Sequence, residues 1–293
     1  MMDNKFPGKD ISSDDQLYKF PLSSSKKKNI VNINKNISFG GKYFPIISGP
    51  NTLENRDLIF KYCEFLEKQN LKLVRAAIYK PLTFPYRSKK YFEMGDKGIK
   101  ILEDIKKNFD VLLVTEIMES SKIEILNNLV DIFQIGARNM QNFPLVCSVA
   151  KTKKPIILKR HFGCSIRDLF GAAEYILLKK NKKVILCERG VSAPHTHRST
   201  SRFILDIQSI PAIKEYSCLP VIVDPSHACF WYKWVADLAL ASFAVGSHGL
   251  ILEVHPDPRN SAVDPLQALG FEDFKKLIKK IKNISKIFNK IIV

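Results

Sequence analysis

The sequence predicts an α/β fold of the TIM-barrel type, a single (β/α)8 barrel domain preceded by a polar N-terminal arm. Three observations predict it. Eight short apolar runs alternate with helical windows from residue 43 onward. Many of these runs end at a cation or a ligand-type residue, as parallel strands do when they deliver side chains to one common mouth. The length of 293 residues, 45% of them hydrophobic, suits one barrel better than two small domains.

The strand candidates are rich in β-branched residues and bounded by polar or turn residues; they lie at 44–48, 72–78, 111–115, 132–135, 155–159, 184–187, 220–223 and 249–254. Helical periodicity is found between them, at 55–69, 98–108, 120–128, 144–152, 166–180, 235–245 and 271–287. An open doubly wound sheet is the rival architecture. We find no glycine-rich first turn of the dinucleotide-binding kind that would favour it.

The first 36 residues differ from the rest of the chain. They are polar, contain a serine run followed by a lysine run at residues 23–28, and show no sustained periodicity. We therefore expect residues 1–36 to form a basic arm that is a tail or docks loosely, and residues 37–293 to form the barrel.

Composition excludes several classes of protein. No apolar run approaches the length of a membrane span and no hydrophobic signal core is present, so we expect a soluble, cytoplasmic protein with no membrane partner. The six cysteines lack the CxxC spacing of a zinc or redox site, which predicts free thiols. The formal net charge is +17, but much of the excess is lysine at helix surfaces and in the arm. Without a recognised module we expect no specific nucleic-acid partner.

Five cations lie at or just beyond predicted strand ends: Arg75, Lys80, Arg138, Lys159 and Arg189. Ordinary surface ion pairs are one interpretation of them. Because their flanking sequence is nearly continuous apolar residues, we expect them to be desolvated together, and such a cluster needs an anionic partner. Guanidinium groups match phosphate or carboxylate, so a small ligand with several negative charges is the favoured interpretation.

Histidine and carboxylate side chains end the last two predicted strands. His227 follows Val223-Asp224-Pro-Ser, and Glu253 precedes Val-His255. A histidine and a glutamate at one barrel mouth suit a divalent metal or acid–base chemistry.

Several of these motifs together resemble one family. Ser48-Gly-Pro-Asn, Ile135-Gly-Ala-Arg-Asn, Ile185-Leu-Cys-Glu-Arg-Gly, Pro220-Val-Ile-Val-Asp-Pro-Ser-His and Glu253-Val-His-Pro-Asp-Pro occur in the order found in the 3-deoxy-7-phosphoheptulonate (DAHP) synthases that consist of a bare barrel. The resemblance runs from about residue 43 to the end. The same superfamily includes the 3-deoxy-octulosonate 8-phosphate synthases.

The resemblance implies an enzyme that condenses phosphoenolpyruvate with an aldose or aldose phosphate, gives a 3-deoxy-2-ulosonic acid or its phosphate, and releases inorganic phosphate. It implies a homodimer or homotetramer. By the same resemblance Arg138, Arg189 and Ala137 hold the phosphate of phosphoenolpyruvate, while Arg75, Lys80 and Lys159 surround its carboxylate and bridging oxygen. The implied catalytic residues are Lys80, Asn51, His227 and Asp264.

One departure from the family concerns metal. Metal-dependent members have a cysteine, a histidine, a glutamate and an aspartate as ligands; His227, Glu253 and Asp264 match the last three, and Asn51 stands at the cysteine position. Loss of a thiolate removes the soft, charged ligand. We expect either no metal cofactor or a weakly bound divalent metal of the Mn, Zn or Fe type.

A second departure concerns the acceptor. Leu82 stands where DAHP synthases have the arginine of Lys-Pro-Arg-Thr, which would hold the phosphate of erythrose 4-phosphate. Candidate acceptor-binding residues in its place are Thr83, Arg87, Lys89, Lys90 and Arg202. Two alternatives remain open: a paralogue that uses a different aldehyde in specialised metabolism, and a barrel that has lost catalysis and acts as a binding protein.

Overall fold

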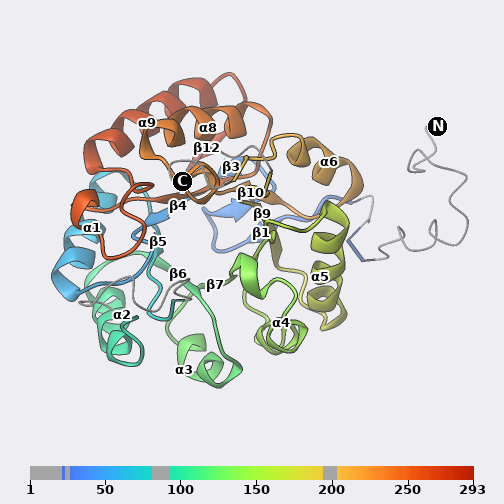
Figure 1. Cartoon of the computed structure of the whole chain (residues 1–293), viewed down its shortest axis with the longest axis horizontal. Helices are drawn as coiled ribbons and strands as arrows, with labels where there is room; N and C mark the ends of the chain where they lie inside the picture. The colour runs from blue at the N-terminus through green and yellow to red at the C-terminus, as the bar shows by residue number, and fades with distance from the viewer. Residues whose placement is uncertain (1–21, 24–26, 81–92, 194–202) are drawn as a thin grey trace, which may run out of the picture.

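Eight parallel strands close into a barrel in the computed structural model, which describes residues 22–23, 27–80, 93–193 and 203–293 (Figure 1). The strand order around the barrel is β10-β11-β4-β5-β6-β7-β8-β9. The barrel strands are β4 (Ile46–Gly49), β5 (Leu73–Arg75), β6 (Leu112–Glu116), β7 (Ile132–Ile135), β8 (Ile156–Lys159), β9 (Val184–Glu188), β10 (Val221–Val223) and β11 (Leu250–Glu253). Each predicted strand range overlaps one of them, so the predicted fold class is confirmed.

Helices surround the barrel on its outside (Figure 1). They are α1 (Arg56–Lys68), α2 (Lys97–Asn108), α3 (Ile123–Asn127), α4 (Phe143–Ala150), α5 (Ile166–Leu178), α6 (Ser209–Tyr216), α7 (Pro225–Cys229), α8 (Tyr232–Ala244) and α9 (Phe271–Ser285), with short 3-10 turns η2 (Ser120–Lys122), η3 (Ala137–Asn139) and η4 (Pro258–Asn260). Local sequence explains where two of them begin. Asn55 accepts a hydrogen bond from the Leu58 amide at the start of α1, and Ser165 forms a capping box with Asp168 at the start of α5.

Two helices, α6 and α7, were not predicted from the sequence. They have eight and five residues, and the helical windows found from hydrophobic periodicity do not include them. A local cap marks the start of α7, because Asp224 directly follows β10 and its side chain accepts a hydrogen bond from the His227 amide at 3.0 Å.

The lower half of the barrel interior is apolar. One side chain from every barrel strand belongs to a single buried cluster: Ile47, Leu73, Val114, Ile132, Ile157, Ile185, Ile222 and Ile251. Side chains of a strand alternate between its two faces, so the next inward-facing position on each strand lies two residues further on. The remaining core lies between the strands and the surrounding helices.

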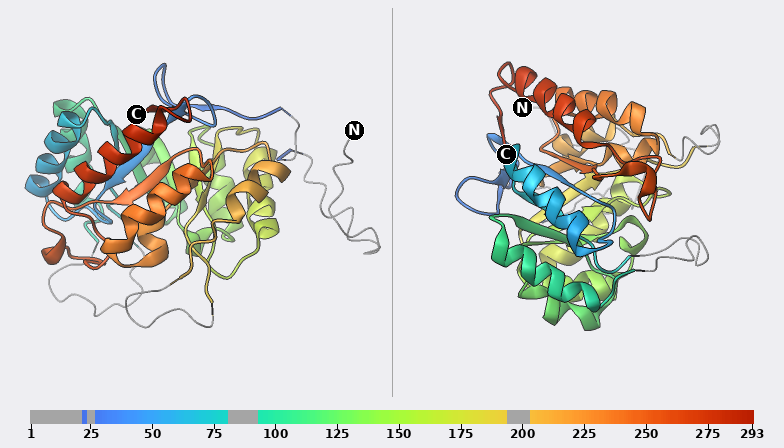
Figure 2. Two further views of the ribbon diagram at one scale, coloured as in Figure 1. Left: turned by 90° about the horizontal axis from the view of Figure 1, so that it is seen from above. Right: turned by 90° about the vertical axis from the view of Figure 1, so that its left-hand side faces the viewer.

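A hairpin covers the amino-terminal end of the barrel. Strands β1 (Val31–Asn32) and β2 (Ser38–Phe39) pair antiparallel, and Val31, Ile37 and Phe39 join the apolar cluster inside the barrel. Strand β12 (Ile291–Ile292) pairs nearby with β3 (Tyr43–Phe44), and Figure 2 shows the hairpin and the C-terminus on the same side. Of the residues before the expected boundary at residue 36, Val31 is buried in this cluster and Ile33 packs against it, whereas Asn32 and residues 34–36 are exposed.

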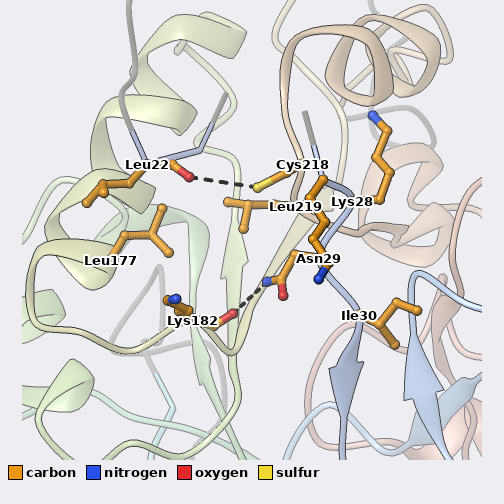
Figure 3. Close-up of a pocket in the computed structure, with 9 residues that line it drawn as sticks. Leu22, Lys28, Asn29, Ile30, Leu177, Lys182, Cys218 and Leu219 are labelled. Carbon is orange, nitrogen blue, oxygen red and sulfur yellow. Dashed lines mark hydrogen bonds between the residues drawn. The ribbon is translucent and has the colours of Figure 1, made fainter. Parts of the chain in front are cut away.

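The described residues of the expected arm are also held against the barrel rather than loosely docked. The Asn29 amide donates to the Cys218 carbonyl at 2.8 Å, and its side chain donates to the Lys182 carbonyl at 2.6 Å. Figure 3 shows the groove of about 580 Å³ that this segment borders, with Leu177 and Leu219 among its apolar lining. The groove lies near the starts of β9 and β10, away from the strand ends that carry the predicted site residues.

Two expectations from composition can be compared with the described part of the chain. No helix there combines the length and the apolar character that crossing a membrane requires. The six cysteines are all free, as predicted, and four are buried: Cys63, Cys187, Cys218 and Cys229.

If the hairpin completes the core, Phe39→Ala lowers the free energy of unfolding by about 3–5 kcal/mol, because Phe39 is fully buried in the interior cluster. Urea denaturation measures this. Ile30→Ala is the matched control, since Ile30 is 50% exposed, and its effect stays within about 0.5 kcal/mol. Equal stabilities of the two variants would contradict this role of the hairpin.

Candidate active site

A layer of polar side chains lies directly above the apolar cluster. For six strands, the residue two positions after the one in the apolar cluster is polar and at most 4% exposed. These six residues are Arg75, Glu116, Gln134, Lys159, Asp224 and Glu253. The other two strands contribute Gly49 and Cys187 at the same step. The carboxyl end of the barrel therefore presents a buried layer of cations and carboxylates.

Arg75 and Glu253 form a buried ion pair across one intervening strand. Arg75 Nη2 lies 3.6 Å from Glu253 Oε2, and β4 separates their strands. Arg75 also donates to the carbonyl oxygens of Gly49 and Pro50 at 3.1 Å each. Gly49 has φ +147°, and a Cβ at this position would lie 2.5 Å from the Arg75 carbonyl oxygen. Only glycine permits this close approach of the two strands.

A second buried ion pair joins Lys159 and Asp224. Their strands are again separated by one strand, β9. Asp224 also lies 2.9 Å from His227 Nδ1. Burial alone would raise the pKa of Asp224, but its contacts with His227 and Lys159 hold that pKa well below its usual value. Burial lowers the pKa of His227 well below its usual value, so its imidazole is neutral at pH 7.

Lys80 and Glu116 form the third pair, with Lys80 Nζ 3.2 Å from Glu116 Oε2. The Glu116 carboxylate occupies space that a side chain at residue 136 would need, because a Cβ added to Gly136 would lie 1.9 Å from Glu116 Oε1. Gly136 therefore leaves room for the carboxylate that holds Lys80.

The pKa of the Glu253 carboxyl group is altered in the direction opposite to that of Asp224. Burial raises its pKa to about 8, although the neighbouring Arg75 guanidinium opposes the rise. The Gln267 amide donates to Glu253 Oε2, and Glu253 Oε1 has no hydrogen-bond partner among the described residues. Glu253 can therefore stay protonated near neutral pH.

Asn51 and Asp264 meet at the edge of this layer, where the Asn51 amide donates to Asp264 Oδ2 at 3.1 Å. Asp264 adopts a left-handed backbone conformation with φ 51°, which aspartate tolerates better than most residues.

The residues matched to metal ligands are close to one another, since His227 Nε2 lies 3.9 Å from Glu253 Oε2. Within residues 22–23, 27–80, 93–193 and 203–293 no three His, Cys, Asp or Glu side chains are grouped as metal ligands. An amide N–H that points at Asp264 does not suit a tightly bound metal, so this arrangement does not fit one.

The two remaining predicted cations lie further out. Arg189 is 6% exposed, and its guanidinium carbon lies 4.3 Å from the Phe203 ring centre. Arg138 lies in the 3-10 turn η3 together with Ala137, and its side chain is exposed. The expectation that all five cations are desolvated is therefore wrong for Arg138, because η3 begins beyond the end of β7.

Arg75, Lys80 and Lys159 lie together, as predicted. Their positive charges lie beside carboxyl groups of the protein, which the sequence analysis did not expect. Each has a carboxyl group of the protein beside it, so Lys80 and Lys159 have compensating partners within the protein, whereas Glu253, when protonated, leaves the charge of Arg75 uncompensated. Sequence reasoning selected Glu253, as a candidate metal ligand, but not Glu116 or Asp224. Glu116 and Asp224 directly follow predicted strands, and the rule that identified the cations would have identified these carboxylates as well.

Arg160 and Glu188 form a separate buried pair that supports the ends of β8 and β9. Arg160 Nη1 lies 2.9 Å from Glu188 Oε2 and 2.7 Å from Asp206 Oδ2. The Gly190 amide donates to Glu188 Oε1 at 2.6 Å. This network lies next in sequence to Lys159 and Arg189.

The residues predicted to bind the aldehyde acceptor, together with Leu82, lie outside the described residues. This concerns Leu82, Thr83, Arg87, Lys89, Lys90 and Arg202. His255, which the sequence placed near Glu253, lies 3.2 Å from Glu54 Oε1 through Nε2 and accepts a hydrogen bond from the Asp257 amide at 2.9 Å.

Comparisons with known proteins agree with this geometry. The sequence model of the DAHP synthetase I family matches residues 23–290. A phospho-2-dehydro-3-deoxyheptonate aldolase of Thermotoga maritima is 38% identical over 249 residues, which are 85% of this chain and 72% of that protein. A 2-dehydro-3-deoxyphosphooctonate aldolase of Syntrophobacter fumaroxidans is 28% identical over 263 residues, which are 85% of this chain and 89% of that protein.

Solved structures show the same similarity. The crystal structure of the Thermotoga maritima aldolase, also titled a DAHP synthase, superposes with a TM-score of 0.84 at 34% identity and covers 91% of this chain and 76% of that one. A truncated 3-deoxy-D-arabino-heptulosonate 7-phosphate synthase of the same organism superposes with a TM-score of 0.84 at 33% identity and covers 94% of this chain and 100% of that one.

We expect Gly136→Ala to displace the Glu116 carboxylate from Lys80 and to lower the free energy of unfolding by about 1–2 kcal/mol, measured by urea denaturation. The backbone of Gly136 (φ −65°, ψ 158°) suits alanine, so the clash with Glu116 is the expected cause. Gly171→Ala in α5 is the control, because a Cβ there meets nothing within 4 Å and alanine favours helix. A Gly136→Ala variant as stable as the control would contradict the placement of Glu116.

Proposed function

This chain belongs to the DAHP synthetase I family, and we propose that it condenses phosphoenolpyruvate with an aldose phosphate and releases inorganic phosphate. The observation that carries the proposal is the buried charged layer at the carboxyl end of a barrel whose sequence matches that family from residue 23 to residue 290. The two relatives are named for heptonate and octonate products, which agrees with a sugar phosphate as acceptor.

We place phosphoenolpyruvate with its phosphate at Arg138, Arg189 and the backbone of Ala137, following the resemblance. Its carboxylate and bridging oxygen then lie near Arg75, Lys80 and Lys159. Charge-assisted hydrogen bonds from guanidinium and ammonium groups are strong where water is excluded, which supports this placement for the buried Arg75 and Lys159.

The proposed reaction forms one carbon–carbon bond. C3 of phosphoenolpyruvate attacks the aldehyde carbon, and the C=O π electrons move to the aldehyde oxygen, which becomes a hydroxyl. A water oxygen adds to C2, and the C2–O bond to phosphate breaks with its electron pair leaving on phosphate as C2 becomes a ketone. The two protons of the water end on the new hydroxyl and on the released phosphate. The cations neutralise the two acidic ends of the ligand as charge shifts between them.

His227 is the group that we propose to take a proton from the attacking water. It is neutral, and contact of Nδ1 with Asp224 leaves Nε2 as the site for a proton. Asp224, which stays ionised, would stabilise the resulting imidazolium, as a buried carboxylate does for a catalytic histidine in other enzymes.

We propose that a metal is dispensable or weakly held. In metal-binding relatives a divalent ion would polarise the aldehyde oxygen. Asn51 offers a neutral amide instead of a thiolate, and its N–H is engaged with Asp264. No step proposed above depends on a metal.

The assembly and the location follow from the resemblance as proposals. We propose a homodimer or homotetramer acting in the cytoplasm. Light scattering coupled to size-exclusion chromatography measures the assembly.

The test of the function is phosphate release from phosphoenolpyruvate with a panel of aldose phosphates, with and without chelator. The wild type is expected to release phosphate only when an aldose is present, and chelator lowers the rate little. Arg138→Ala lowers kcat/KM at least about tenfold, equivalent to about 1.4 kcal/mol, because it removes a phosphate contact. Arg56→Ala, on the exposed surface of α1, is the control.

Binding of phosphoenolpyruvate without turnover of any aldose would favour the alternative of a barrel that has lost catalysis and acts as a binding protein. Absence of binding at millimolar phosphoenolpyruvate would overturn the synthase proposal. Loss of all activity in chelator, restored by added metal, would overturn the proposal that a metal is dispensable or weakly held.

The acceptor is tested at residue 82. If no residue replaces the missing arginine, Leu82→Arg raises kcat/KM for erythrose 4-phosphate by restoring a charged contact with the acceptor phosphate. If Arg87 has taken over, the wild type is already efficient and Arg87→Ala slows it. Efficient wild-type turnover that is insensitive to Arg87→Ala would contradict both the altered acceptor and this replacement anchor. Arabinose 5-phosphate and unphosphorylated aldoses complete the comparison.

A further inference from the structure

His161 lies beside the segment that carries Arg138, although sequence analysis gave it no role. It follows Lys159 and Arg160 at the carboxyl end of β8. Its backbone amide contacts Met140 Sδ at 3.3 Å, and Met140 ends the 3-10 turn that contains Arg138. The ring is partly exposed, so it lies at the mouth of the barrel and not in the core.

A column of aromatic rings links the same histidine to Arg189. The His161 and Phe162 ring centres are 4.1 Å apart, and the Phe162 and Phe203 ring centres are 5.0 Å apart with the rings stacked. The guanidinium of Arg189 lies over Phe203. The position of the His161 ring is thus tied to both arginines that we place at the phosphate of phosphoenolpyruvate.

The hydrogen bonds of the ring determine which nitrogen is available. The Gly163 amide donates to His161 Nδ1 at 3.1 Å, and Cys164 Sγ lies 3.7 Å from the same nitrogen. Because Nδ1 accepts, the neutral ring carries its hydrogen on Nε2. The hydrogen bonds found among the described residues include none to Nε2. Burial, and after it the charges of Arg189 and Arg138, lower the pKa of His161, so the ring is neutral at pH 7.

The Nε2–H of His161 needs a hydrogen-bond acceptor. A guanidinium has donors only, so neither arginine can accept the Nε2–H bond. An oxyanion bound between the two arginines supplies several acceptor oxygens, and a third donor on a ring that packs against Phe162 loses little conformational freedom when it binds.

We propose that His161 is a phosphate-binding residue, whose Nε2–H donates to the same phosphate group as Arg138 and Arg189. The proposal rests on the proposed function, because that function places phosphoenolpyruvate at this end of the barrel. It adds to that function a neutral donor that recognises the phosphate end of the ligand and not its carboxylate end.

The test uses two substitutions at this position. His161→Phe keeps an aromatic ring on Phe162 and removes the donor, whereas His161→Gln keeps an N–H donor and removes the ring. Isothermal calorimetry with phosphoenolpyruvate and with inorganic phosphate is expected to show about tenfold weaker binding for His161→Phe and a change within about threefold for His161→Gln. Pyruvate, which lacks the phosphate, is expected to bind both variants as it binds the wild type. Cys164→Ala is the control, since it contacts the ring but not the ligand.

The outcomes separate this proposal from the function on which it rests. A wild type that binds phosphoenolpyruvate while His161→Phe binds it equally well overturns the role of His161 alone. Equal losses in both variants, with pyruvate affected as well, show a structural role and also overturn it. A wild type that binds neither phosphoenolpyruvate nor phosphate overturns both.

A third measurement covers the case in which the Phe variant fails to fold. Titration of the wild type with inorganic phosphate, followed by NMR of the histidine rings, is expected to shift the His161 signal, assigned through the Gln variant. A saturated protein whose His161 signal has not moved would overturn the proposal.

Discussion

The two-residue alternation of inward-facing side chains in a closed parallel barrel is the constraint on which the rest of this structure depends. Each strand delivers an apolar residue to the interior cluster, and six of the eight place a polar side chain in the layer above two residues later. On β8 these are Ile157 and Lys159, and on β11 they are Ile251 and Glu253. A shift of one residue in any strand would place the polar residue against the helices and remove it from the site.

Burial of so many charges is possible because the barrel brings opposite charges together from alternate strands. Arg75 meets Glu253 and Lys159 meets Asp224, each across one intervening strand. A buried ion without a partner would cost several kcal/mol, so these pairs make the buried charged layer compatible with a stable barrel. Because its pKa is raised, Glu253 can be protonated near neutral pH. A protonated Glu253 leaves the positive charge of Arg75 available to an incoming carboxylate.

The two ends of the barrel have different roles. The hairpin with Val31 and Phe39 covers the amino-terminal end with apolar side chains, and the C-terminal strand β12 pairs next to it through β3. The carboxyl end carries the charged layer, with Arg189 and His161 further out. The residues that stabilise the core and the residues of the candidate site therefore lie at opposite ends of the barrel. A loop at the carboxyl end can change in sequence without loss of the core.

The sequence by itself determined the fold class, the eight strands and the cations at their ends, because hydrophobic periodicity and strand ends are local properties of the chain. It also indicated the family through short motifs such as the one that contains Arg138. It did not reveal that Val31 is buried inside the barrel, since a hairpin with two-residue strands has too little periodicity to be recognised.

Only the tertiary structure decided which charges pair, that Arg138 is exposed, and where the imidazole of His161 lies. Lys159 and Asp224 are 65 residues apart and meet only when the barrel closes. That contact depends on strand order and stagger, which no local pattern of residues encodes.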